Sequence, residues 1–138
     1  MMLYLDTSSL VKLYIEEPFS DEVRRWIRDA TTLVSSCVAY PETLSAFARR
    51  HRDRDLDDAG FHRVVQGFQR DWEAFAVVQV QESLAGQMAM KHVIRGFDAV
   101  HLAAALVIRD SVPTLAFTSF DGRLNQAATQ EGLTVLVP

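Results

Sequence analysis

Four carboxylates in separate parts of the sequence stand beside apolar runs that predict buried strands or helices. Asp6 follows the run LYL, Glu42 lies in AYPETLSAF, Asp98 in RGFDAVHLAAAL and Asp121 in FTSFDGRLNQAA. An ionised aspartate at the end of a buried strand is costly unless a cation compensates it, and no Lys or Arg precedes Lys12. Carboxylate oxygens are the ligands that Mg²⁺ and Mn²⁺ prefer. The chemistry that these residue types suggest is therefore the binding of a divalent cation.

Each acid taken singly also has a structural explanation. An acidic residue in the first turn of a helix stabilises it by roughly 0.3–1 kcal/mol, and Asp121 with Gly122 is a common turn dipeptide. Four like charges gathered at one place, however, repel one another unless cations hold them. Apart from these four, the chain has as many acidic as basic residues, so its net charge of −4 equals that of the predicted site. The complete set favours a cation site over four separate helix caps.

The elements that must position these acids follow from the hydrophobic periodicity. Five short apolar runs predict strands at residues 3–5, 32–36, 76–80, 114–119 and 133–137. Helical spacing of apolar residues predicts helices at residues 8–16, 20–29, from Pro41 onwards, 57–74, 82–94, 98–109 and 122–130. Ser20 is expected to cap the second helix, and Pro41 is tolerated within the first turn of the third.

Strands and helices alternate along the chain, and the strands lack the polar alternation of a sheet with one solvated face. This pattern predicts a central, mostly parallel five-stranded sheet with helices on both faces, which is a three-layer α/β/α fold. A chain of 138 residues is expected to form a single domain, residues 1–138. Ligands of such sheets bind beyond the carboxyl ends of the strands. We therefore expect the four acids at one edge of the sheet.

The composition is that of an ordinary globular protein, with 49% hydrophobic and 23% charged residues. No apolar run approaches the roughly 18 residues that a membrane span needs, and no signal peptide opens the chain. The single cysteine, Cys37, excludes an internal disulfide and suits a reducing compartment. We expect a cytoplasmic protein with no membrane association, in which Cys37 is a small buried side chain and not a catalytic thiol.

Arginine outnumbers lysine twelve to two, although the net charge is negative. Guanidinium groups suit bidentate contacts with phosphate, but nearby aspartates leave open the alternative of a solvated, charge-balanced surface. Arg49 follows Glu42 by seven residues and is expected on the same helix face. Arg95 precedes Asp98 by three residues and could either hold a phosphate or pair with that acid.

Four stretches of the sequence resemble, in order and spacing, the four acidic motifs of the PIN domain: LYLDTSSLVKLY, AYPETLSAF, RGFDAVHLAAAL and FTSFDGRLNQAA. Among PIN proteins, the chain looks most like the VapC-type toxins of type II toxin–antitoxin systems. The resemblance runs from residue 3 to the end of the chain. It implies a PIN fold and an endoribonuclease, dependent on Mg²⁺ or Mn²⁺, that cleaves single-stranded or looped RNA with a metal-activated water.

The resemblance also implies a role for each acid. Asp6 and Asp98 would be the principal metal ligands, and Glu42 and Asp121 would complete the site, partly through water. Neighbouring hydroxyl groups would orient these carboxylates, namely those of Ser8, Thr118 and Ser119. The implied partners are a cognate antitoxin protein, the RNA substrate and a second copy of the chain in a homodimer.

Several assignments stay open at this point. Ser8 could equally be the N-cap of the first helix, and Arg49 and Arg95 are candidate RNA contacts. His101 lies one helical turn after Asp98, where it could act as a general base. Packing of His101 between helix and sheet is the favoured explanation.

Three other kinds of protein could have a similar pattern, and each requires or lacks particular residues. A phosphoacceptor receiver-like domain needs a Lys after its last strands, and no Lys follows Lys91. A haloacid-dehalogenase phosphatase needs a second Asp two residues after the first, where this chain has Ser8. A catalytically silent PIN-fold scaffold or binding module is expected to lack one of the acids, and none is missing. The nuclease is therefore the prediction, with the silent scaffold as its main alternative.

Overall fold

The computed structural model describes residues 1–138 as five strands and seven helices. The strands are β1 (Met2–Leu5), β2 (Thr32–Ser36), β3 (Ala76–Val78), β4 (Ala116–Thr118) and β5 (Thr134–Val135). The helices are α1 (Thr7–Tyr14), α2 (Ser20–Asp29), α3 (Ala39–Arg52), α4 (Asp58–Trp72), α5 (Glu82–His92), α6 (Gly96–Ser111) and α7 (Gly122–Gln130). Every predicted element is present, and the last three strands are shorter than predicted.

All five strands pair in parallel, in the order β3-β2-β1-β4-β5. The first strand thus lies in the middle, with β2 on one side and β4 on the other. The chain builds the sheet outwards in one direction from β1 and then in the other, so a topological switch point lies between β1 and β4. Ligands of open α/β sheets bind beyond the strand ends at such a point. Asp6 follows β1 and Asp121 lies just beyond β4.

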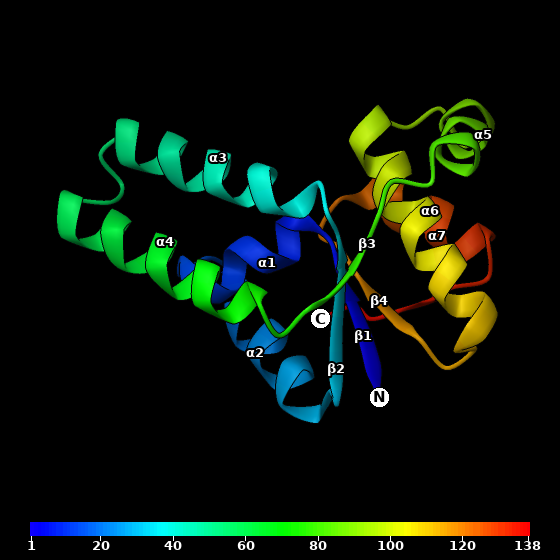
Figure 1. Ribbon diagram of the computed structural model, residues 1–138, viewed down its shortest axis with the longest axis horizontal. Coiled ribbons are helices and arrows are strands. Elements are labelled where there is room, and N and C mark those ends of the chain that lie inside the picture. The colour runs from blue at the N-terminus through cyan, green and yellow to red at the C-terminus, as the bar shows by residue number, and fades with distance from the viewer.

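The sheet separates two groups of helices, with α1 to α4 on one side and α5 to α7 on the other (Figure 1). Alternate residues of β1 face opposite layers: Leu3 and Leu5 pack in one core cluster with Leu10 of α1, and Tyr4 packs in the other. The Tyr4 cluster also contains Leu102 of α6, so both faces of the sheet are buried under helices. The predicted three-layer α/β/α fold is confirmed.

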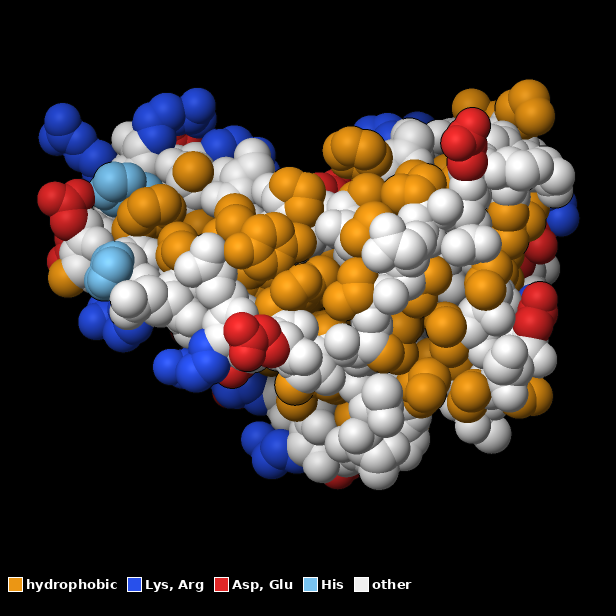
Figure 2. Space-filling view, viewed as in Figure 1, with side chains coloured by type: hydrophobic (Ala, Val, Ile, Leu, Met, Phe, Trp, Pro, Cys, Tyr) orange, Lys and Arg blue, Asp and Glu red, His pale blue; other side chains and the backbone are white.

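Helices α3 and α4 form a hairpin that extends away from the sheet (Figure 1). Its own core cluster joins Phe47 of α3 and Phe68 of α4 to Val11 and Ile15 near α1. Lys and Arg side chains gather over this end of the molecule in the space-filling view (Figure 2). None of the seven helices combines the length and the apolar character that crossing a bilayer requires.

Two local predictions are wrong. The residue that caps α2 is Phe19, with a left-handed φ of 72°, and not Ser20. The hydroxyl group of Ser20 is buried and instead accepts from the Glu17 amide and donates to the Ile15 carbonyl, which ties down the turn before the helix. Cys37 was expected to be buried but is only partly so, because it lies in the turn after β2.

Candidate active site

Asp6 ends β1 and caps α1, and only 4% of the residue is exposed. Its Oδ1 accepts hydrogen bonds from the Ser9 amide at 3.0 Å and from the Ser8 hydroxyl at 2.7 Å. The Ser8 hydroxyl in turn accepts from the Phe120 amide at 2.9 Å, beyond the end of β4. Ser8 therefore orients Asp6 and links it to the neighbouring strand end, whereas the helix cap is Asp6 itself.

Asp98 and Asp121 face a shared cation. Asp98 lies in the first turn of α6, and Asp121 caps α7 by accepting from the Leu124 amide at 3.0 Å. The Arg95 guanidinium lies 3.3 Å from Asp98 Oδ2 through Nε and 3.1 Å from Asp121 Oδ2 through Nη2. Of the two roles expected for Arg95, the structure shows the ion pair.

The charge of Asp98 is not fully compensated. Burial raises the pKa of Asp98, and the negative charges of Asp121 and Asp6 raise it further, against the opposing effect of Arg95. A raised carboxyl pKa means that the folded protein disfavours the ionised form. The region around Asp98 is therefore short of positive charge even with Arg95 in place.

Glu42 lies in the first turn of α3 and is held by two donors. The Thr7 hydroxyl donates to Glu42 Oε1 at 2.6 Å, and His101 Nε2 lies 2.9 Å from the same oxygen. Burial alone would raise the pKa of Glu42, but the hydrogen bonds from His101 and Thr7 and the nearby Arg95 charge outweigh it and lower that pKa. Glu42 is thus an ionised, oriented carboxylate.

His101 is 2% exposed, which confirms the predicted packing between helix and sheet. Its ring also has polar contacts that the sequence did not predict, because Nδ1 lies 2.8 Å from the Tyr4 hydroxyl and Nε2 contacts Glu42. Burial and the nearby Asp6 charge raise the pKa of Tyr4 well above its usual value, so its hydroxyl stays protonated. Both ring nitrogens of His101 therefore contact polar side chains, the buried Tyr4 and the partly buried Glu42.

One hollow of about 330 Å³ is lined by all four predicted acids together with Thr7, Ser8, Arg49, Arg95 and His101. The four acids come from the ends of β1 and β4 and from the first turns of α3 and α6. The parallel sheet brings these segments to one edge, as the sequence predicted. We call this hollow the acidic hollow.

The hydroxyl groups of Thr118 and Ser119 form hydrogen bonds with backbone atoms and not with carboxylates. Thr118 donates to the Tyr4 carbonyl at 3.0 Å and contacts none of the four acids through its hydroxyl. Ser119 accepts from the Asp121 amide at 3.0 Å, so it positions the Asp121 backbone. Of the three hydroxyl residues expected to orient carboxylates, only Ser8 does so directly.

The donor chemistry of the acidic hollow fits a hard divalent cation, since carboxylate oxygens are its preferred ligands. No three His, Cys, Asp or Glu side chains, however, lie close enough together to form a ready-made metal site. Arg95 lies between two of the acids, and its side chain is 82% exposed and has room to swing outwards. The four acids are the residues that would hold such a cation, and Arg95 supplies the positive charge beside Asp98 and Asp121 in the metal-free protein.

Arg49 and Glu42 both line the acidic hollow, as expected for residues on one helix face, and Arg49 donates to the Ser45 hydroxyl at 2.9 Å. It also lines a neighbouring hollow with Thr7, Glu42 and the exposed ring of Phe97. Arg49 forms no ion pair. Its guanidinium is thus available to a ligand, in contrast to that of Arg95.

Sequence reasoning missed the contacts of Tyr4 and Thr7. The D-T-S run places Thr7 directly after an acid, but nothing in that run indicates that its partner is a carboxylate 35 residues away. Tyr4 and His101 are 97 residues apart. The sequence did indicate that His101 lies near the acids, because Asp98 and His101 are spaced i, i+3 and therefore share one helix face.

The model of the PIN domain family matches residues 3–130 of this chain. Because the match spans most of the chain, and because the fold has the expected layers and acidic edge, the chain belongs to the PIN-domain family. The chain is also 34% identical to Ribonuclease VapC45 of Mycobacterium tuberculosis, over 97% of this chain and 94% of that protein. The predicted resemblance to VapC-type PIN proteins is confirmed.

Two solved structures are similar in fold. VapC20 of Mycobacterium tuberculosis, described as a sarcin–ricin loop cleaving toxin, has a TM-score of 0.68 and 19% identity, with 99% of each chain covered. VapBC-1 from nontypeable Haemophilus influenzae has a TM-score of 0.66 and 16% identity, with 99% of this chain and 97% of that chain covered. At these identities the similarity concerns the fold.

Proposed function

We propose that this chain is a metal-dependent endoribonuclease that acts as the toxin of a toxin–antitoxin pair. The observation that carries the proposal is the convergence of four carboxylates from four segments on one hollow, with only Arg95 as a cation between two of them. The ribonuclease name of a relative that matches almost the whole chain supports the same activity.

Asp6 and Asp98 are proposed as the principal ligands of Mg²⁺ or Mn²⁺, with Glu42 and Asp121 completing the site. A divalent cation bound there would supply a hydroxide-like nucleophile near neutral pH and neutralise charge on the phosphate. Ser8 and the α1 backbone keep Asp6 oriented. Thr7 and His101 do the same for Glu42, so that its carboxylate is fixed before any ligand arrives.

The substrate is proposed to be single-stranded or looped RNA, because an acidic hollow at a sheet edge admits a splayed strand more readily than a stiff duplex. Since the hollow itself repels phosphate, the binding energy must come from the arginines around it. Arg49 is free to contact a phosphate. Arg95 would contact the substrate only after it leaves Asp98 and Asp121.

The partners are proposed from similarity. A VapC-type toxin is paired with an antitoxin, and the fold of this chain is similar to that of VapBC-1. A homodimer is the proposed assembly, and the cytoplasm is the proposed location because the RNA substrate is there.

The proposal is tested by cleavage of a single-stranded RNA with the purified chain. Cleavage is expected in the presence of Mg²⁺ or Mn²⁺, and no cleavage is expected in EDTA. Ca²⁺ should support little cleavage, because its looser coordination shell positions the nucleophile and the phosphate less well. Full activity in excess EDTA would remove the metal from the mechanism. An absence of cleavage under all of these conditions would favour the silent scaffold.

A further inference from the structure

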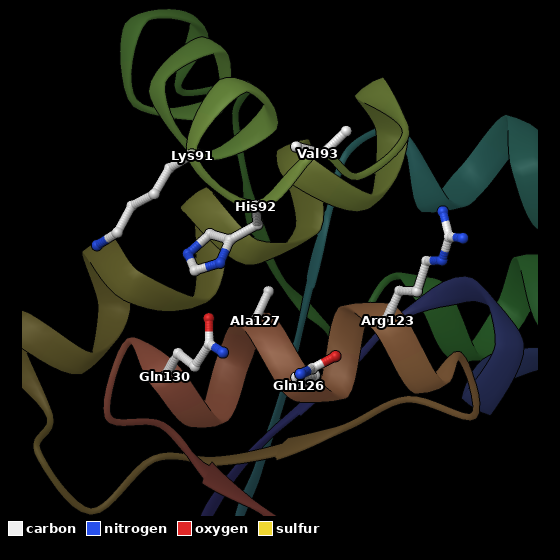
Figure 3. A pocket seen from close by; sticks show the side chains of 7 residues that line it. All are labelled: Lys91, His92, Val93, Arg123, Gln126, Ala127 and Gln130. Atoms are coloured by element: carbon white, nitrogen blue, oxygen red, sulfur yellow. The ribbon is translucent and has the colours of Figure 1, made fainter.

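A second hollow, of about 420 Å³, lies between the C-terminal end of α5 and the exposed face of α7 (Figure 3). We call it the α5–α7 hollow. One wall carries Lys91, His92 and Val93, and the facing wall carries three side chains of α7, namely Arg123, Gln126 and Gln130. The α7 residues are spaced i, i+3 and i+7, so they form one stripe along the helix.

A third hollow lies between the α5–α7 hollow and the acidic hollow and adjoins both. This hollow, of about 540 Å³, shares Val93 and Arg123 with the former and Arg95, Asp98 and Asp121 with the latter. On the opposite side, the acidic hollow adjoins the one lined by Arg49 and Phe97. Four adjoining hollows thus form a row that passes over the four acids, and we call this row the trench.

Arg123 carries the uncompensated positive charge of the α5–α7 hollow. The ammonium group of Lys91 lies 2.6 Å from Glu131, whose carboxylate balances its charge, and His92 contacts the same carboxylate at 2.7 Å. Arg123 is exposed and forms no ion pair. On the other side of the acids the free cation is Arg49. The trench thus has one unpaired arginine on each side of the acidic hollow.

The rest of the lining suits the base of a nucleotide. Val93 is 77% exposed and has a left-handed φ of 52°, which a β-branched residue adopts only under strain. Strained residues cluster at ligand-binding sites. The exposed side chain offers an apolar surface, and the amides of Gln126 and Gln130 offer both donors and acceptors. Phosphate, apolar and amide contacts are thus all within one hollow.

We propose that the α5–α7 hollow binds the single-stranded RNA arm on one side of the scissile phosphate, with Arg123 contacting a phosphate of that arm. This inference rests on the proposed nuclease function and adds where one arm of the substrate lies. RNA is favoured over a protein segment because only one further hollow separates this one from the acids, and because one free guanidinium with two amides matches a phosphodiester and its base.

The test is the binding of a labelled single-stranded oligouridine of about twelve nucleotides, measured in EDTA by fluorescence anisotropy over a range of salt. Arg123→Gln is expected to weaken binding about tenfold, as for the loss of one hydrogen bond to a charged group. Its log–log salt dependence should flatten by about 0.7, the value for one lost phosphate contact on a single strand. Gln126→Ala should weaken binding without changing the slope.

The matched control is Arg25→Gln. Arg25 is also exposed and without an ion pair, but it lies on α2, which lines no part of the trench. Its replacement should leave affinity and slope unchanged. Arg123 lies in the first turn of α7, where removal of a positive charge does not weaken the helix, so the variant is expected to fold.

Cleavage in Mg²⁺ is measured separately, so the two proposals can fail independently. Loss of binding with Arg123→Gln supports the subsite even if no cleavage is seen with the parent. Equal binding, slope and cleavage by parent and Arg123→Gln overturn the subsite and leave the nuclease intact. A variant that binds RNA normally but no longer binds the antitoxin would also overturn it, and would assign the hollow to that protein.

Discussion

Glu42, His101 and Tyr4 form a hydrogen-bonded chain that joins α3, α6 and β1. A carboxylate can only accept, so His101 Nε2 must donate to Glu42. The Tyr4 hydroxyl lies 2.8 Å from His101 Nδ1, so the imidazole ring is held between the two side chains. Because every polar atom of this chain is buried or partly buried, each partner depends on the others.

Glu42 should make stability depend on pH in a definite direction. Its pKa is lowered in the folded protein, so ionised Glu42 stabilises the fold at pH values above the ordinary glutamate pKa of about 4.3. That stabilisation is lost as the pH falls through the folded pKa. Glu42→Gln should therefore be less stable than the parent at pH 7 and should approach it below about pH 4. Urea unfolding across this pH range measures the difference, and a constant difference would contradict the expectation.

Asp98 has the opposite effect on the metal-free protein. Its pKa is raised, so its ionised form disfavours the fold at neutral pH. Asp98→Asn should therefore be as stable as the parent or more stable, by about 0.5–2 kcal/mol, as is common when a strained functional site is relaxed. RNA cleavage should fall roughly a hundredfold or more, since a ligand is lost. Added Mg²⁺ should raise the melting temperature of the parent and not of the variant.

The control for this variant lies on the same helix. Asp110 is 77% exposed at the C-terminal end of α6, so Asp110→Asn should keep both cleavage and the Mg²⁺ response. Asp6→Asn should behave as Asp98→Asn does in both assays. If Asp98→Asn also kept both, Asp98 would be an ordinary first-turn residue of α6 and not a metal ligand.

At the scale of elements, the segment from α5 to α6 carries both a strained residue and Arg95. Helices commonly end at a glycine in the left-handed conformation, but α5 ends at Val93 with a φ of 52°. The left-handed conformation costs a residue with a Cβ roughly 1–2 kcal/mol. The bend that it makes brings the chain back from α5 to Arg95, which caps α6 and faces Asp98.

Val93→Gly should therefore raise the free energy of unfolding by about 1 kcal/mol, because glycine adopts this φ without strain. Little packing is lost, since Val93 is 77% exposed. The comparison is Val112→Gly at the end of α6, where φ is −130° and no strain exists to relieve. That variant should lose about 0.5–1 kcal/mol through backbone entropy. Equal losses in the two variants would show that Val93 stores no strain.

At the scale of the whole molecule, the α3–α4 hairpin and the sheet should unfold together. The hairpin extends outwards (Figure 1), yet Trp72 packs against the cluster around Phe68 and also against the cluster around Leu3 and Leu5. Trp26, the other tryptophan, packs only with the second cluster and stacks on Phe120. A side chain shared by two clusters couples their unfolding.

Two single-tryptophan variants measure this coupling. In Trp26→Phe the fluorescence reports on the hairpin through Trp72, and in Trp72→Phe it reports on the sheet through Trp26. In each variant the fluorescence midpoint is expected to coincide with the midpoint of the far-ultraviolet circular dichroism, as for a single cooperative domain. An earlier fluorescence transition in Trp26→Phe would mean that the hairpin unfolds separately.

The alternation of helices and strands, the parallel sheet and the edge to which the four acids belong could all be predicted from the amino-acid sequence. These features depend on local periodicity and on one general rule, that parallel strands place their carboxyl ends together. Asp6 and Asp121 could be placed in this way because Asp6 directly follows β1 and Asp121 lies three residues beyond the end of β4. The first residues of helices were harder to predict. Ser20 was wrongly assigned as the cap of α2, because nothing in the amino-acid sequence indicates that Phe19 adopts a left-handed conformation there.

Which side chains meet at that edge could not be predicted and is known only from the packed fold. Arg95 had two possible roles from its spacing to Asp98, and the position of Asp121 in the fold selected the ion pair. The pairing of Tyr4 with His101 and the hollow that exposes Arg123 likewise join segments far apart in the chain. Periodicity reports which face of an element a residue occupies, whereas a hydrogen bond or a hollow depends on how two elements are packed, and that is set by the core as a whole.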